Sequence, residues 1–269
     1  LRYADVQDGG QAQVNGLLFT GGFAVYDGDL RLEQCRFTDM QSEDGINLKN
    51  GHIVMQDCVV ANAASDAIDI DFGTGEVRNS QFINIKGDGV DLSGSKVTVA
   101  NNRFENVGDK GVSVGEDSHP IIINNLFRGC QIAISSKDRS HARVAYSTFV
   151  DNVLAIEVKR KKPMFGPGSG EFINNVFSGN QVLLEEDYFS KGLATIQNSV
   201  VDGQSNCATC QIVTTPFRSV ETGDYRLTPA IMDRSSFEAA VLDWAESWMK
   251  DNGYTAQQPG IFTDLRHQY

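Results

Sequence analysis

Short runs that alternate hydrophobic and polar residues recur along most of this chain. In each run two aliphatic residues flank one polar or small residue, and glycine, asparagine or aspartate follows within a few positions. Clear examples are residues 45–48, 67–70, 89–92, 111–114, 131–134 and 155–158. Alternation with period two predicts β-strands with the aliphatic side chains inside and the middle residue outside. The runs are too short and too often interrupted to be helices.

A second marker, usually a small polar residue, any residue and then an aromatic or aliphatic one, accompanies these runs. Its copies occur at 35–37, 58–60, 80–82, 102–104, 125–127, 147–149, 175–177 and 199–201. The interval is about 22 or 23 residues, except across an insertion around 159–170 and in the last coil. A fixed period of this length predicts a solenoid, in which each coil contributes three short strands and buries its aliphatic residues against its neighbours.

The predicted fold is therefore all-β, a single-stranded right-handed parallel β-helix of about eight coils. We expect one structural domain with an irregular coil or cap at 1–27, the β-helix at 28–214 and a C-terminal cap at 215–269. Residues 237–250 have the apolar spacing of an amphipathic capping helix. Inside the coils we expect a core stack of phenylalanines and an asparagine ladder. These residues are Phe82, Phe104, Phe127, Phe149 and Phe177, and Asn102, Asn125 and Asn175.

Composition narrows the possible partners. A net charge of -12 and a pI of about 4.7 argue against nucleic acid, because phosphate binding requires a positive surface. No apolar run reaches the roughly 18 residues that a membrane span needs. The acidic surface is compatible with calcium and with an extracellular or cell-surface location. Cys207 and Cys210 predict a local disulfide or two unreactive thiols rather than a zinc site, since no second pair of cysteines completes one.

Stacking of the coils aligns equivalent residues in columns at a spacing of about 4.8 Å. Three columns on one face carry polar residues. The first column lies just before the first strand of successive coils and contains Asp44, Asp66, Asp88 and Lys110. The second lies on the outward face of that strand and contains Asn47, Asp69, Asp91 and Ser113. The third lies two positions later and contains Lys49, Asp71, Ser93 and Gly115. Carboxylates this close must either raise their pKa values or bind a cation.

Calcium is the cation that these columns predict, since it accepts six to eight oxygen ligands in flexible geometry. The candidate ligands are Asp66, Asp69, Asp71, Asp88 and Asp91. The alternative is that aspartates in tight turns merely cap the backbone. Basic residues dominate the following coils on or beside the same face, namely Lys110, Lys137, Arg139, Lys159, Arg160, Lys161 and Lys162. Acidic and basic halves side by side predict that a cation and an anionic polysaccharide bind together, although a solvated lysine-rich loop would explain the insertion equally well.

The coil pattern of residues 28–203 resembles the pectate-lyase-like β-helix superfamily, which includes polysaccharide lyases, epimerases and some glycosidases. The segments 65–72, 87–95, 108–116, 136–138 and 161–163 more closely resemble β-helix segments of bacterial surface proteins. Those segments accompany spore-coat-kinase-like or lamin-tail-like modules, so the resemblance implies part of a larger multidomain surface protein.

Similarity to the calcium-dependent lyases of this superfamily also implies roles for individual residues. Asp66, Asp69, Asp88 and Asp91, with Asp71, would hold calcium against a substrate carboxylate, and Lys110 or Lys137 would remove the C5 proton. Polar residues along the same face are candidates for substrate binding. They are Asn47, Lys49, Ser113, Glu116, Arg139, Lys159 and Lys162.

Three functions follow from these features. The first is a calcium-dependent lyase, or a related epimerase, that acts on a uronate-containing glycan. The second is a noncatalytic module that binds glycan at a cell surface. The third is a glycoside hydrolase that uses a carboxylate pair such as Asp69 with Asp91 or Asp88, because adjacent coils place carboxylates near the separation found in retaining enzymes.

Overall fold

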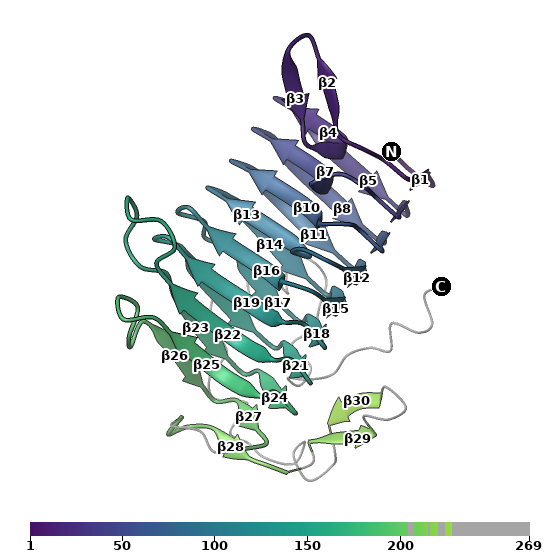
Figure 1. The fold of residues 1–269 in the computed structure, drawn as a ribbon. Helices are drawn as coiled ribbons and strands as arrows, with labels where there is room; N and C mark the ends of the chain where they lie inside the picture. Colours follow the sequence, from purple (N-terminus) through teal and green to yellow (C-terminus); the bar gives the residue numbers. More distant parts are fainter. Residues whose placement is uncertain (204–206, 215, 220–223, 228–269) are drawn as a thin grey trace.

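The computed structural model describes residues 1–203, 207–214, 216–219 and 224–227, which form a stack of β-coils (Figure 1). Each of the eight complete coils contributes one strand to each of three parallel sheets. The first sheet contains β4 (Gly21–Tyr26), β7 (Asp44–Lys49), β10 (Asp66–Asp71), β13 (Val90–Ser93), β16 (Lys110–Gly115), β19 (Ile132–Lys137), β22 (Leu154–Lys159) and β25 (Val182–Glu186). All-β architecture and the number of coils are as predicted.

The second and third sheets complete each coil. The second sheet contains β5 (Leu30–Glu33), β8 (His52–Gln56), β11 (Thr74–Arg78), β14 (Lys96–Ala100), β17 (Ile121–Ile123), β20 (His141–Ala145), β23 (Ser169–Ile173) and β26 (Ala194–Gln197). The third contains β1 (Asp5–Gln7), β6 (Arg36–Thr38), β9 (Val59–Ala61), β12 (Gln81–Ile85), β15 (Arg103–Val107), β18 (Leu126–Arg128), β21 (Thr148–Val150), β24 (Val176–Ser178), β27 (Val200–Val201) and β28 (Gln211–Ile212).

The period-two pattern sets the inside of the first sheet. Ile46 pairs with Ile68 and Leu48 with Ile70 in adjacent parallel strands, and all four side chains are fully buried. One residue of slip would turn this aliphatic face outward, so the pattern fixes the register. Register in turn fixes which polar residues align on the outward face.

The predicted phenylalanine stack and asparagine ladder are both present in the core. The rings of Phe82, Phe104, Phe127, Phe149 and Phe177 stack with centroids 4.6–5.1 Å apart. Asn102 accepts a hydrogen bond from the backbone N–H of Ser80 at 2.9 Å, and Asn125 accepts one from that of Asn102 at 2.8 Å. These contacts satisfy backbone groups at the bend before the third sheet, where no strand partner is available.

The first coil includes part of the predicted irregular coil or cap at 1–27. β4 pairs with β7, so residues 21–26 form the first strand of the first sheet. A hairpin of β2 (Ala12–Val14) and β3 (Leu17–Phe19) projects from this end (Figure 1). The aliphatic side chains of the hairpin are about half exposed, so they do not form part of the buried face of the coils.

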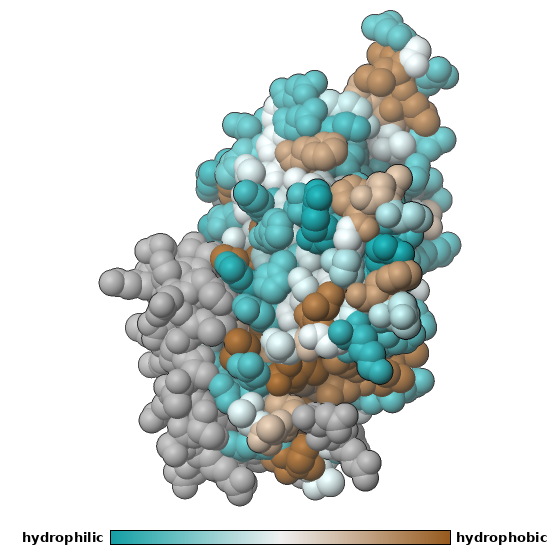
Figure 2. All heavy atoms as spheres, turned by 90° about the vertical axis from the view of Figure 1, so that its left-hand side faces the viewer, coloured by the Kyte–Doolittle hydropathy of each residue, from teal (hydrophilic) through white to brown (hydrophobic). Residues whose placement is uncertain are grey.

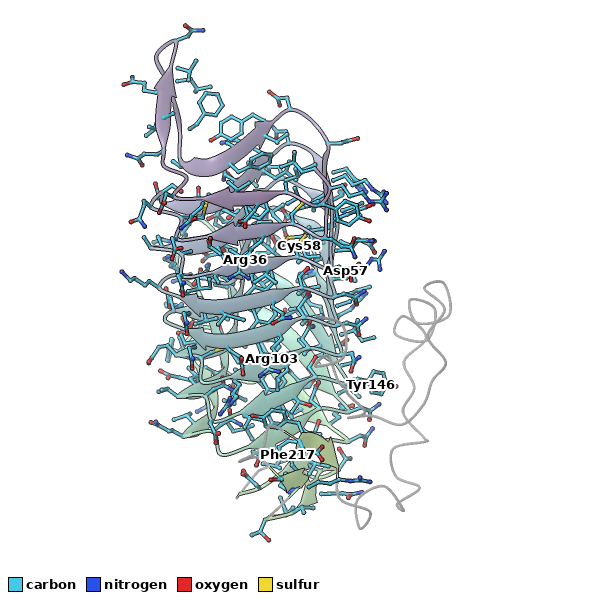
Figure 3. The ribbon with its side chains drawn as sticks, turned by 90° about the vertical axis from the view of Figure 1, so that its right-hand side faces the viewer. Arg36, Asp57, Cys58, Arg103, Tyr146 and Phe217 are labelled. Atoms are coloured by element: carbon cyan, nitrogen blue, oxygen red, sulfur yellow. A yellow bond between two sulfur atoms is a disulfide. The ribbon has the colours of Figure 1, made fainter. Side chains whose placement is uncertain are left out.

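At the other end, a hairpin of β29 (Phe217–Ser219) and β30 (Asp224–Leu227) follows the coils. Phe217 and Tyr225 pack with Leu126, Val150, Val176 and Val200 in a second apolar cluster on the outside of the third sheet. Figure 3 faces this sheet, with Arg36 and Arg103 on it and Phe217 near its lower end. Cys207 and Cys210 form the predicted local disulfide.

The described residues contain strands and turns without a helix. No segment of this part of the chain is therefore a helix of the length and apolarity that crossing a bilayer requires. The predicted capping helix at 237–250 lies outside the described residues.

Candidate cation and substrate site on the first sheet

Parallel pairing aligns the polar columns on the outward face of the first sheet. Asp69 lies in register with Asn47 on one side and with Asp91 on the other. In the neighbouring columns Asp66 aligns with Asp44, and Asp71 aligns with Lys49. Five aspartates from three consecutive coils thus lie on one stretch of the sheet.

Three of these carboxylates form a compact group. Asp66, Asp88 and Asp91 each offer one oxygen, and the three oxygens lie within 4.8 Å of one another. Backbone amides hold two of them, since Asp66 Oδ1 accepts the N–H of Asp88 at 2.7 Å and Asp88 Oδ1 accepts that of Lys110 at 2.9 Å. Asp91 Oδ1 is buried, and the described residues offer it no hydrogen bond.

Asp69 and Asp71 lie beside this group and have partners of their own. Asn47 donates a hydrogen bond to Asp69 Oδ2 at 2.9 Å. Lys49 Nζ lies 3.8 Å from Asp71 Oδ2. Neither residue belongs to the compact group of three, so the compact group contains fewer residues than the five predicted ligands.

Burial and mutual repulsion disturb the ionisation of these acids. Burial, followed by the charge of Asp88, raises the pKa of Asp66 to about 7. Burial and then the charge of Asp71 raise the pKa of Asp69 to about 9, and burial raises that of Asp44 to about 6. The face therefore holds protons near neutral pH unless a cation compensates the carboxylates.

The two lysines predicted as bases have different surroundings. Lys110 Nζ lies 3.3 Å from Asp88 Oδ1 and 2.5 Å from Asp109 Oδ2. Burial alone would lower the pKa of Lys110, but the two carboxylates outweigh it and raise the pKa. Lys110 is thus held in its charged form, which disfavours it as a proton acceptor.

Lys137 comes from β19 and reaches back across two coils. Its Nζ donates a hydrogen bond to Ser113 Oγ and lies 3.8 Å from Asp91 Oδ1. The side chain crosses Gly115, where a Cβ atom would lie 2.8 Å from Lys137 Cε. Glycine at this position therefore makes room for the lysine.

The residues predicted to bind substrate divide into two sets. Asn47 and Ser113 are buried and contact Asp69 and Lys137, so they are placed to position those side chains. The others are at least partly exposed and ion-paired. Lys49 pairs with Asp71, Glu116 with Lys162, Arg139 with Asp117, and Lys159 with Glu157.

Gly115 and Asp138 were not among the predicted site residues. Asp138 is fully buried, and its Oδ1 accepts the backbone N–H groups of Lys161 at 2.8 Å and Lys162 at 2.6 Å. This contact fixes the start of the insertion and places Lys162 against Glu116. In the sequence, an aspartate at the turn before an insertion is the signal for such a cap. A glycine in a column of polar residues is the signal that a side chain from another coil passes over that position.

The compact group fits calcium by donor type and by spacing. Its three donors are carboxylate oxygens, and oxygens bound to one ion at 2.3–2.6 Å lie within about 5 Å of one another. Asp91 Oδ1, which accepts no hydrogen bond from the described residues, is the atom that a bound cation would satisfy. Asp66, Asp88 and Asp91 are accordingly the residues that would hold the ion.

Comparisons with known proteins agree with this architecture. Residues 44–207 match the family model described as a right handed beta helix region. An alginate lyase from Paenibacillus sp. str. FPU-7 superposes with a TM-score of 0.56 at 16% identity, covering 72% of this chain and 75% of that one. No match was found among curated proteins.

A GH87 alpha-1,3-glucanase catalytic unit from Streptomyces thermodiastaticus strain HF3-3 is also similar, with a TM-score of 0.41 and 15% identity. That match covers 72% of this chain and 50% of the glucanase chain. At 16% identity the alginate lyase shows a shared fold and nothing finer. The match to the family model spans more than half of the residues, and the chain accordingly belongs to the right-handed β-helix family.

Proposed function

We propose that this chain is a calcium-dependent polysaccharide lyase, or an epimerase that shares its proton abstraction, acting on a uronate-containing glycan. The observation that carries the proposal is the position of Lys137 Nζ, 3.8 Å from Asp91 Oδ1. Asp91 is one of the three carboxylates of the compact group. A candidate cation site and a candidate base thus share one face of the β-helix.

Elimination requires a base beside an acidified C–H bond. A bound calcium ion would neutralise the substrate carboxylate and so acidify the C–H bond next to it. Lys137 Nζ would take the C5 proton with its lone pair, and the electrons of that C–H bond would form a C4–C5 double bond. The C4–O bond would break with its electron pair on the leaving oxygen, which takes a proton from water.

The surroundings of Lys137 suit this step. Ser113 Oγ fixes the nitrogen, and a fixed base at the reacting atom lowers the barrier. Lys49, Arg139, Lys159 and Lys162 are partly exposed cations beside the site that could bind carboxylates of adjoining sugars. The alginate lyase with the same fold supports a uronate polymer as substrate.

The test is incubation with alginate and with polygalacturonate in the presence of calcium. We expect new unsaturated chain ends, detected by their ultraviolet absorbance, and no such product after chelation and before calcium is restored. Epimerisation would instead change the uronate composition without shortening the polymer, which proton NMR detects. Tight binding without either product would support the noncatalytic glycan-binding module.

Hydrolysis is a second candidate, supported by the difference in environment among the carboxylates. The pKa of Asp69 is raised to about 9, so this group is protonated near neutral pH and can act as a general acid. Asp91 aligns with it in the adjacent strand and would be the partner carboxylate. New reducing ends without ultraviolet absorbance would identify hydrolysis.

A further inference from the structure

The turns that follow the strands of the first sheet contain one unusual residue. Six equivalent positions, the turn column, have left-handed backbone with φ between 52° and 61°. They are Asp27, Asn50, Phe72, Gly94, Glu116 and Asp138. Glycine, asparagine and aspartate tolerate this conformation, whereas a bulky aromatic residue there is strained. Strain of this kind is common at ligand-binding sites.

Phe72 is exposed as well as strained. Its exposed fraction is 59%, whereas the stacked phenylalanines of the core are fully buried. Gly94 supports the ring from the next coil, since a Cβ at Gly94 would lie 2.7 Å from Phe72 Cδ1 and 2.8 Å from Cε1. A larger residue at this position would displace the ring. The ring therefore rests against backbone while a large part of it remains open to solvent.

The ring also lies at the edge of the acidic face. Phe72 directly follows Asp71, which pairs with Lys49, and two coils further along the turn column Glu116 pairs with Lys162. The loops after β22 and β25 project on the left of Figure 1, and Figure 2 views that side. Hydrophobic side chains there are interspersed with hydrophilic ones. An apolar ring between charged groups complements a sugar, which has C–H groups on its face and hydroxyl or carboxylate groups at its rim.

We infer that Phe72 is a binding residue, the platform on which one uronate ring of the glycan stacks at the edge of the acidic face, where the strands of the first sheet end. This inference rests on the proposed function and deepens it by assigning a sugar subsite. Lys49 and Lys162 flank the subsite and can pair with the carboxylate of the stacked sugar. The turn does not need an aromatic ring for its structure, because the equivalent turn in the preceding coil has Asn50 at this position.

The test compares Phe72→Asn and Phe72→Tyr with the unaltered chain. Titration calorimetry with oligosaccharides of mannuronate and of galacturonate, in calcium, gives the affinity, and thermal denaturation gives the stability. Asparagine accepts the left-handed backbone, so we expect Phe72→Asn to keep or raise the melting temperature while weakening binding about ten-fold, the size of one stacking contact. Phe72→Tyr keeps the ring face and is expected to bind like the unaltered chain.

Tyr3 provides a matched control, because it is 70% exposed and also has a left-handed backbone, with φ of 54°. Tyr3→Asn is expected to leave binding unchanged. Equal affinity of Phe72→Asn and the unaltered chain would overturn the platform and leave the proposed function intact. If Phe72→Asn lowers both the melting temperature and the affinity, the ring has a structural role, and that outcome would also overturn the platform. An unaltered chain that binds none of these oligosaccharides would overturn both.

Discussion

The ammonium nitrogen of Lys137 lies 3.8 Å from Asp91 Oδ1, although the two residues belong to strands two coils apart. The side chain reaches this point by crossing Gly115 in the intervening coil. Ser113, in the same coil as Gly115, accepts a hydrogen bond from the nitrogen. Three coils thus define one position for the candidate base next to the compact carboxylate group.

Substitution of the two lysines should separate catalysis from stability. We expect Lys137→Ala to lower turnover by about 10²–10⁴-fold, because it removes the proton acceptor. Lys110→Ala should retain more turnover but lower the free energy of unfolding by about 3 kcal/mol, because it leaves the buried Asp88 without its ion pair. Measurements of turnover and of urea denaturation for both variants test these two expectations. Full turnover in Lys137→Ala would exclude it as the base.

The glycine that Lys137 crosses should be sensitive to one added methyl group. A Cβ at Gly115 would lie 2.8 Å from Lys137 Cε, so Gly115→Ala is expected to displace the lysine and lower turnover more than it lowers calcium affinity. Gly10→Ala is the control, since nothing lies within 4 Å of a Cβ at that position. Unchanged turnover in Gly115→Ala would show that the path of Lys137 over Gly115 does not matter.

Calcium binding should release protons and weaken at low pH. The pKa of Asp66 is raised to about 7, and burial raises that of Asp88 despite its pairing with Lys110. Because calcium binds the ionised carboxylates, we expect its affinity to fall as pH decreases from about 8 to 5. Calorimetry in buffers of different ionisation enthalpy measures both the affinity and the proton release.

Asp91→Asn removes a charged ligand and should weaken calcium binding by more than about ten-fold. Asp8→Asn, at an exposed position with left-handed backbone that asparagine tolerates, is the control. Equal affinity in the two variants would place the ion away from the compact group.

Without a divalent cation, stability should decrease as pH rises. The pKa values of Asp44, Asp66 and Asp69 are raised from 3.8 to about 6, 7 and 9. Between pH 4 and 9 the folded chain therefore holds protons that the unfolded chain has lost. The free energy of unfolding then falls with rising pH. The stabilisation is complete below the pKa of the unfolded chain and is lost as the pH rises through the pKa of the folded chain.

Thermal denaturation in chelator at several pH values measures this decrease. Calcium should oppose it, since an ion that binds only the folded chain raises its stability. Asp69→Asn should make the melting temperature less dependent on pH above pH 7, because this substitution removes the carboxyl group with the highest of the three pKa values. A melting temperature that rises from pH 5 to 9 in chelator would contradict the assignment of these carboxylates.

The sequence by itself determined the solenoid, its inward face and the alignment of the polar columns. These properties repeat in every coil, and in-register parallel pairing converts a repeat such as Asp69 and Asp91 directly into neighbours. Period-two alternation then decides which side of the strand each residue occupies. The same alternation extends to Gly21–Tyr26, where Phe23 and Val25 lie in register with Ile46 and Leu48.

Only the tertiary structure decided where the long side chains go and which carboxylates group together. A lysine can reach any of several partners within its length, so the column did not show that Lys110 turns to Asp88 and Asp109 while Lys137 crosses Gly115. The insertion after β22 has no equivalent in other coils, and its contact with Asp138 follows from packing rather than from repetition. Local alternation specifies the faces of a strand, whereas contacts between flexible side chains depend on the space that neighbouring coils leave.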